Sequence, residues 1–218
     1  MARSFNGTSD NLSHAAGVIT AASFSVSAWT FPDTTNANRP IVTLDDGVVG
    51  LNVYRFYFSN AASGALRMQT VNSPSSATVT TANTATTGAW NHIVGGEVSA
   101  ASRFVRLNGG TKATETTSVT PVGINKTEIG AEANGGDYFD GLLAEVALWS
   151  VALDDDEQLA LSKGICPLLI RPQSLAGYWP LLGNDGSELD RWKSRFDMTV
   201  TGATKADHPR IYYPWQAP

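Results

Sequence analysis

The chain has 218 residues, a formal net charge of −5, 16% charged residues and a single cysteine. A negative chain without a concentrated basic region is not expected to bind nucleic acid, because phosphate contacts need clustered Lys and Arg side chains. No stretch approaches the ~20 apolar residues of a membrane-spanning helix. The lone Cys166 excludes an internal disulfide and is expected to be a small buried residue.

The first two thirds of the chain consist of short segments with strand-like patterns. Residues 2–13 predict two short strands around a turn at Asn6-Gly7, and 23–31 (SFSVSAWTF) alternates apolar and hydroxyl-bearing residues. Further candidate strands are IVTL, VVGLNVYRFYF, ALRMQTV, a hydroxyl-rich edge segment around TVTT, GAWNHIVGGEV, SRFVRLNGG, ATETTSV and TEIGA. Turn signals every ~8–12 residues between them predict an all-β, two-layer antiparallel sandwich.

Residues 142–148 form a predicted strand that leads into the one predicted helix. Their even positions are all apolar, which is the two-residue period of a strand buried mainly on one face. From Asp154 onward the pattern is helical, because Asp154 can cap a helix and Glu157 completes a capping box. Gly164 then supplies a C-terminal stop. We therefore expect one short helix near 154–163.

Five pieces of the chain occur in the order found in a known family, over residues 5–163. They are FNGTSDNLS, FSVSAWTF, GAWNHIVG, VRLNGG and the long closing segment IGAEANGGDYFDGLLAEVALWSVALDDDE. With these pieces the chain resembles the laminin-G-like, concanavalin-A-like lectin-glucanase jelly-roll family. The resemblance implies a two-layer antiparallel jelly-roll sandwich.

The segment 175–204 (LAGYWPLLGNDGSELDRWKSRFDMTVTGAT) resembles the strand pair that opens ordinary members of this family, although here it comes last. We therefore predict a circularly permuted single sandwich over residues 1–204, in which 175–204 supply the family's first strands. Residues 205–218 follow as a C-terminal arm. The moved segment closes either its own sandwich or, as a domain swap, a neighbour's, and we expect self-closure.

Catalysis is not predicted. Glycosidases on this sandwich resemble one another in carrying alternating acidic residues on one strand, whereas Glu145 is alone on its strand. A two-carboxylate mechanism needs a partner ~5–10 Å away. His14, His92 and His208 are dispersed without metal-ligand spacing, and His92 is expected to be a structural strand residue. We expect a non-enzymatic protein without a cofactor.

Calcium is a candidate ligand because loops and strand ends carry aspartates, and calcium binds carboxylate and carbonyl oxygens. These aspartates are Asp10, Asp45, Asp46, Asp137 and Asp140. The family's closing strand usually reads Asp-Glu, whereas this chain has Ala144-Glu145. Turn formation and capping explain the aspartates without a metal, and we favour that interpretation.

A glycan site needs an exposed aromatic ring and planar polar groups for the sugar hydroxyls. The loop that contains Asn134, Asp137 and Tyr138 offers this chemistry, and Trp192 is a second platform. These four residues are the predicted glycan-binding residues. The remaining strand tryptophans are predicted to belong to the core, and they are Trp29, Trp90, Trp149 and Trp179.

The C-terminal sequence HPRIYYPWQAP is too rich in proline for a helix and too apolar for a solvated tail. Its candidate partner-contact residues are Arg210, Tyr212, Tyr213 and Trp215. Such a segment either docks on a partner or packs back over its own sandwich, and the sequence leaves both alternatives open.

Two functions remain. The chain is similar to small stand-alone laminin-G-like proteins among the structural proteins of tailed bacteriophages, which implies a capsid decoration protein or otherwise a tail component. Its partners would be the major capsid protein or another virion protein, in a homo-oligomer such as a trimer. The alternative is a module that recognises cell-surface or polysaccharide glycans. The N-terminus lacks the pattern of a secretory signal, which favours a virion protein assembled in the host cytoplasm.

Overall fold

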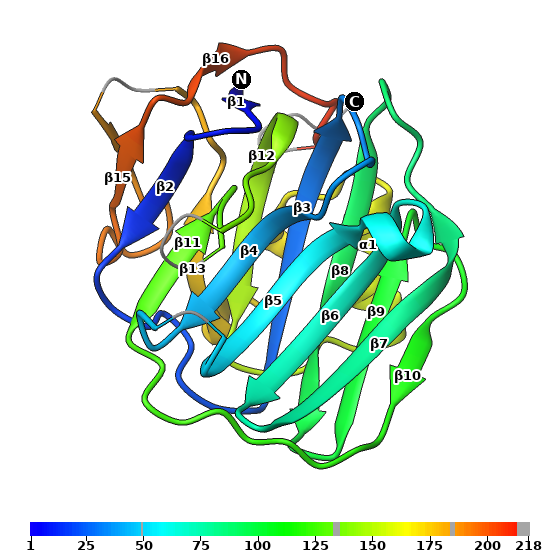
Figure 1. Cartoon of the computed structure of the whole chain (residues 1–218). Helices are drawn as coiled ribbons and strands as arrows, with labels where there is room; N and C mark the ends of the chain where they lie inside the picture. Colours follow the sequence, from blue (N-terminus) through cyan, green and yellow to red (C-terminus); the bar gives the residue numbers. More distant parts are fainter. Residues whose placement is uncertain (49, 133–135, 184–185, 213–218) are drawn as a thin grey trace.

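A computed structural model describes residues 1–48, 50–132, 136–183 and 186–212 of the chain. Its strands form two eight-stranded antiparallel sheets that pack face to face (Figure 1). In the described residues, one short α-helix lies outside these sheets. The predicted two-layer antiparallel sandwich with one short helix is therefore confirmed. No helix in this part of the chain is long and apolar enough to cross a membrane.

Sheet A has the order β10-β9-β8-β3-β12-β1-β16, and β13 also pairs with β12. Its strands are β1 (Ala2–Asn6), β3 (Phe24–Pro32), β8 (Asn91–Ser99), β9 (Ser102–Leu107), β10 (Ala113–Glu115), β12 (Asp140–Trp149), β13 (Leu175–Trp179) and β16 (Thr204–Ala206). Sheet B has the order β14-β15-β2-β11-β4-β5-β6-β7. Its strands are β2 (Asn11–His14), β4 (Arg39–Asp45), β5 (Asn52–Ser59), β6 (Ala65–Asn72), β7 (Ser75–Thr84), β11 (Lys126–Ile129), β14 (Ser187–Glu188) and β15 (Met198–Thr201). Outside the sheets lie α1 (Asp155–Ser162) and the 3₁₀ turns η1 (Asn60–Ala62), η3 (Pro167–Leu169) and η4 (Pro172–Ser174).

Alternation along the strands of sheet B places one of its faces in the core. One row of residues paired directly across seven strands is entirely apolar: Val200, Leu12, Ile129, Val42, Phe56, Met68 and Val79. These side chains pack with residues of sheet A such as Phe24 and Val146 in one cluster. Burial of apolar surface contributes about 25 cal/mol per Å², so this row stabilises both the sheet and the pairing of the two layers.

A second apolar cluster covers the outer face of sheet A. Trp149 and Tyr178 point away from the main core and pack with Leu161 of α1 and with Ile211 near the C-terminus. Cys166 is fully buried in this cluster, as predicted. The outer face of sheet A is therefore closed by the helix and the C-terminal part of the chain.

The predicted helix is confirmed together with its caps. The Asp154 carboxylate accepts from the Glu157 backbone N–H at 3.0 Å, and the Glu157 carboxylate accepts from the Asp154 N–H at 2.8 Å. This is the reciprocal capping box expected from the sequence. Gly164 has a φ of +86° just after the helix, a conformation that glycine adopts without strain.

The strands that follow the helix pair with strands of the same chain. β13 pairs with β12, β15 pairs with β2, and β16 pairs with β1. The C-terminal strands thus lie beside the N-terminal ones at one end of Figure 1, where β16, β1, β15 and β2 meet. That residues 175–204 stand in for the family's opening strands remains a prediction.

Some segments differ from the sequence expectations. The hydroxyl-rich segment after β6 is an edge strand, β7, as predicted, but ATETTSV contributes only the three-residue β10.

Trp149 and Trp179 are fully buried as predicted. The prediction that Trp90 is a core residue on a strand is wrong. Trp90 lies just before β8 and is half-buried, with its ring centre 5.7 Å from that of Phe31. Trp29 is half-buried on the outer face of β3, where it packs against the second apolar cluster.

A buried ion network joins β8, β9 and β10 at one edge of sheet A. Arg103 is fully buried and donates to Glu97 at 3.1 Å and to the carbonyls of Ala100 and Thr117, each at 2.8 Å. Glu115 of β10 is a second carboxylate partner. A guanidinium can be buried in this way only because several acceptors surround it.

We expect Arg103→Met to lower the free energy of unfolding by about 3–5 kcal/mol, because the change leaves the buried Glu97 carboxylate without its cation. Urea denaturation measures this loss. Arg191→Met removes an exposed arginine and is the matched control, with an expected change within about 0.5 kcal/mol. Equal effects of the two substitutions would contradict the role of Arg103.

The candidate calcium aspartates make turn and ion-pair contacts. Asp46 accepts from the Val48 N–H at 2.9 Å, and Asp10 accepts from the Asn6 N–H at 3.1 Å. Asp45 accepts from the Gly47 N–H at 2.7 Å, while its other oxygen, Oδ2, is buried without a hydrogen-bond partner in the described residues. Burial raises the pKa of Asp45 from 3.8 to about 6.

The raised pKa of Asp45 predicts a pH-dependent stability. Between pH ~4 and ~6 the folded protein holds a proton on Asp45 that the unfolded chain releases, so this contribution to stability is present at low pH and is lost as the pH rises through about 6. Asp45→Asn keeps the acceptor for Gly47 and removes the titration. The stability of this variant relative to the wild type should therefore increase between pH 4 and 6.5, as followed by urea denaturation. A constant difference over this range would exclude a raised pKa at Asp45.

Candidate functional site

The outer face of sheet B carries a continuous row of polar side chains. Residues paired directly across all eight strands form this polar row: Ser187, Thr199, Ser13, Glu128, Thr43, Arg55, Gln69 and Thr78. All of them except Ser187 are adjacent in sequence to a residue of the apolar row, so their side chains point away from the core. Thr43 and Glu128 are nevertheless buried on this face. Figure 1 looks onto this face; the short turn η1 lies where β5 ends and β6 begins, and the one α-helix of the described residues packs on sheet A instead.

Arg55 of β5 joins the polar row to its surroundings by several contacts. Its guanidinium donates to Gln69 at 2.6 Å, pairs with Glu132, and lies 4.5 Å from the centre of the Tyr57 ring. Its Nε atom is buried and has no acceptor in the described residues. A buried donor without an acceptor is unfavourable, and the other contacts of the guanidinium offset this cost.

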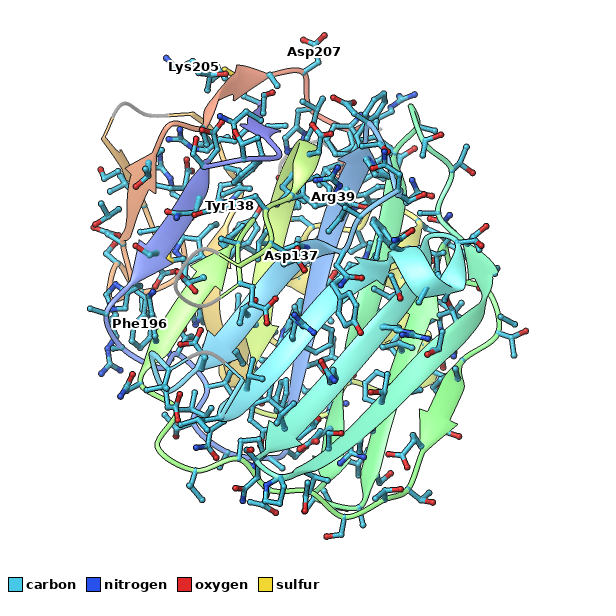
Figure 2. All side chains as sticks on the ribbon, viewed as in Figure 1. Arg39, Asp137, Tyr138, Phe196, Lys205 and Asp207 are labelled. Atoms are coloured by element: carbon cyan, nitrogen blue, oxygen red, sulfur yellow. The ribbon has the colours of Figure 1, made fainter. Side chains whose placement is uncertain are left out.

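The predicted glycan loop lies next to Arg55. A bridge between Ala131 and Tyr138 and a hydrogen bond of 3.0 Å from the Glu132 N–H to the Asp137 carbonyl close this hairpin. Glu132 ties it to Arg55 of β5, and Arg39 of β4 donates to the Tyr138 carbonyl at 3.1 Å. Figure 2 shows the labelled residues Arg39, Asp137 and Tyr138 grouped on the side that carries these contacts. Two strands of sheet B therefore hold the hairpin.

The structure separates the two predicted sugar platforms. Asp137 and Tyr138 are half-buried in the hairpin beside sheet B, and Asn134 lies outside the described residues. Trp192 packs against the second apolar cluster, on the opposite side of the sandwich, and its indole N–H is buried without an acceptor in this part of the chain. A small glycan on the hairpin would therefore not reach Trp192.

Sequence reasoning missed Arg55, Gln69 and Thr78. The segments VYRFYF and LRMQT do contain a signal, because each places polar residues at alternate positions of a strand. That alternation indicates a solvent-facing side. Only the register of β5, β6 and β7 shows that these residues lie in one row.

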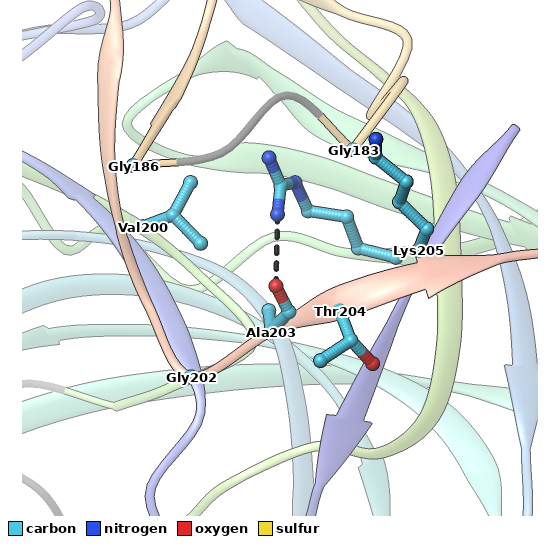
Figure 3. Close-up of a pocket in the computed structure, with 8 residues that line it drawn as sticks. Gly183, Gly186, Val200, Gly202, Ala203, Thr204 and Lys205 are labelled. Carbon is cyan, nitrogen blue, oxygen red and sulfur yellow. Dashed lines mark hydrogen bonds between the residues drawn. The ribbon is translucent and has the colours of Figure 1, made fainter.

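A pocket of about 450 Å³ lies away from this face, where β1 meets the C-terminal strands β15 and β16 (Figure 3). Arg3 lies in it and donates to the Ala203 carbonyl at 2.8 Å. Its charge is paired with Glu188 at 2.8 Å. No aromatic residue is among the described residues that line the pocket, and Gly183 and Gly202 contribute bare backbone. The pocket therefore lacks a surface for stacking on a sugar.

Glu145 lies under the C-terminal segment on the other side of the molecule. Its carboxylate accepts from the Tyr178 hydroxyl at 2.5 Å and lies 2.7 Å from the Nε2 atom of His208. Glu145 is 1% exposed. A buried carboxylate held by two side chains is not placed to act on a substrate. Its partners stand 33 and 63 positions away in the sequence, which is why they were not predicted.

The described part of the C-terminal arm packs on its own sandwich. Tyr212 exchanges backbone hydrogen bonds with Gly164 at 2.7 Å and Cys166 at 3.1 Å. The Tyr212 side chain is 46% exposed and has the exposed Arg210 guanidinium 5.8 Å from its ring centre. Tyr213 and Trp215 lie outside the described residues.

The outer face of sheet B can hold polar ligands by hydrogen bonds. Guanidinium, amide and hydroxyl groups at Arg55, Gln69 and Thr78 supply donors and acceptors of the kind that fix sugar hydroxyls. Within the described residues, no group of three or more His, Cys, Asp or Glu side chains is placed to hold a metal ion.

Several solved structures share this fold. A putative carbohydrate-binding protein from Bacteroides ovatus is 20% identical, with a TM-score of 0.65 over 97% of this chain and 62% of that one. The CBM40 of a Ruminococcus gnavus IT-sialidase, bound to α2,3-sialyllactose, is 14% identical, with a TM-score of 0.60 over 74% of this chain and 98% of that one. A heptameric SAP-like pentraxin from Limulus polyphemus is 17% identical, with a TM-score of 0.59 over 74% and 81% of the two chains. At these identities the likeness shows the fold alone.

No curated protein sequence matches the chain significantly. A family model described as the concanavalin A-like lectin/glucanases superfamily matches residues 6–157. The match agrees with the resemblance of the five sequence pieces and covers more than half of the chain. The chain therefore belongs to the concanavalin A-like lectin/glucanase superfamily.

Proposed function

We propose that this protein is a non-enzymatic carbohydrate-binding protein that holds glycans on the outer face of sheet B. The single observation that carries the proposal is the polar row at β5, β6 and β7, because Arg55, Gln69 and Thr78 are half-buried there and present guanidinium, amide and hydroxyl groups on the face opposite α1. The likeness to solved carbohydrate-binding structures supports it. Neutral sugars offer hydroxyl groups, which match such donors and acceptors.

The carboxylates of this face favour binding over catalysis. Glu132 pairs with Arg55, Glu128 lies 2.8 Å from Lys126, and Asp140 lies 3.4 Å from Arg39. A hydrolase of the usual two-carboxylate type needs one carboxyl that keeps its proton near neutral pH and a second one nearby. Asp45 also lies on this face and has its pKa raised to about 6, but it is fully buried and therefore out of a substrate's reach. The other three carboxylates are each held by a cation of the protein, and so this face suits a binding role.

A glycan array followed by titration of the best oligosaccharide tests the proposal. We expect Gln69→Ala to weaken binding about tenfold, because it removes a hydrogen-bonding group and loosens Arg55. Tyr138→Ala in the hairpin should also weaken it. Gln173→Ala is the matched control, since Gln173 is exposed in η4 next to the second apolar cluster. Absence of glycan binding, or unchanged binding by both variants, would refute the proposal.

We also propose, as a second function, that the protein is a surface component of a tailed-phage virion, on the capsid or otherwise on the tail. The observation that favours it is the exposed Arg210–Tyr212 pair on the packed C-terminal segment. Arg and Tyr are enriched where proteins contact one another. The partner would be the major capsid protein or another virion protein, in a homo-oligomer such as a trimer.

Mass spectrometry of purified particles from a phage that encodes this chain tests the virion proposal. We expect the protein in stoichiometric amounts that persist through density-gradient purification. Arg210→Ala with Tyr212→Ala should reduce its incorporation, whereas Gln173→Ala should leave it unchanged. Absence of the wild-type protein from the particles would end this proposal without affecting the glycan site.

A further inference from the structure

The charges around Tyr57 on the outer face of sheet B do not balance. Arg55 and Arg67 stand on the neighbouring strands β5 and β6, and Tyr57 lies directly across from Arg67. Glu132 pairs with Arg55. Arg67 donates from Nε to the Thr80 hydroxyl at 3.1 Å and forms no ion pair within the described residues. This part of the face therefore carries two guanidinium groups and one paired carboxylate.

The same two arginines have N–H groups without acceptors. The Nε atom of Arg55 is buried and unpartnered in the described residues. Arg67 is half-buried. Among the described residues, its Nε atom donates to a protein acceptor and its two terminal nitrogens do not. Guanidinium groups bind carboxylates through two parallel, charge-assisted hydrogen bonds, and these are stronger than bonds to neutral acceptors. A ligand carboxylate would satisfy the free edge of Arg67.

The groups beside Arg67 suit the rest of a sugar. Thr80 is directly across from Arg67 on β7, and Gln69 and Thr78 form the next outward pair along the same two strands. Neighbouring strands lie ~4.8 Å apart. A sugar whose carboxylate rests on Arg67 would therefore place its hydroxyls against the amide of Gln69 and the hydroxyl of Thr78.

We propose that the glycan bound by this face is acidic, with a sugar carboxylate at Arg67. This inference rests on the proposed carbohydrate-binding function and narrows its ligand class. Uronic acids and sialic acids both supply such a carboxylate, so the experiment includes both sources. The recognition depends on charge, and binding should therefore weaken as salt is added.

The test compares charged and neutral forms of the same glycan by isothermal titration calorimetry with the full chain. One pair is polygalacturonate and its methyl ester, and the other is 3′-sialyllactose and lactose. In at least one of the two pairs, we expect the charged glycan to bind at least about ten times more tightly than its neutral counterpart. Arg67→Gln should remove this difference, whereas Arg191→Gln, which removes the same charge at an exposed turn, should keep it. Thermal unfolding of both variants verifies that they remain folded.

The outcomes separate this inference from the proposed function. Equal binding of the charged and neutral members, with a loss in Gln69→Ala, overturns the acidic ligand and leaves the glycan site standing. A preference for the charged member that survives Arg67→Gln also overturns the inference, because another group would then recognise the carboxylate. Failure of the glycan array and of both pairs to show binding overturns the inference and the proposed function together.

Discussion

The register of the eight strands of sheet B is the constraint on which the fold and its surface chemistry both depend. One register pairs Leu12, Phe56 and Met68 with apolar neighbours and places them in the core. The same register puts Arg55 and Gln69 side by side on the outer face. A slip of one residue would expose the apolar row and bury the polar one. Apolar burial therefore fixes the register, and the register in turn aligns the polar row.

The two outer faces of the sandwich differ in how far other parts of the chain cover them. After β12 the sequence supplies α1, the 3₁₀ turns and the segment that ends at Tyr212, and these pack on sheet A around Trp149. Residues that turn outward on sheet A, such as His92 and Glu145, are consequently buried. Burial lowers the pKa of His92 to about 3, so this histidine is neutral in the folded protein. On sheet B the outer side chains of β5, β6 and β7, such as Arg55, Gln69 and Thr78, are only half-buried, which is why the glycan proposal concerns that part of the face.

The sequence predicts features that depend on neighbouring residues and misses those that depend on distant ones. The capping box of Asp154 and Glu157 spans three residues, and its geometry follows from local sequence alone. The hairpin residues Asp137 and Tyr138 were also predicted, because loop chemistry is visible in composition. The partnership of Glu132 with Arg55 joins distant segments, and no local pattern encodes it. Local sequence therefore points to the loop of the candidate site and not to its strands, and the sugar-binding role of Asp137 and Tyr138 stays a prediction.

The polar row suits recognition because the sheet holds its side chains in fixed positions. Backbone ladders on both sides restrain β5 and β6, and Arg55 is further held by Tyr57, Gln69 and Glu132. A side chain that is already ordered loses little conformational freedom when it binds, so more of each contact contributes to affinity. Strand-borne groups of this kind also keep a fixed spacing, which can match the repeat of a polymer. The strand register that stabilises the sandwich would thus also fix the geometry of the proposed glycan site.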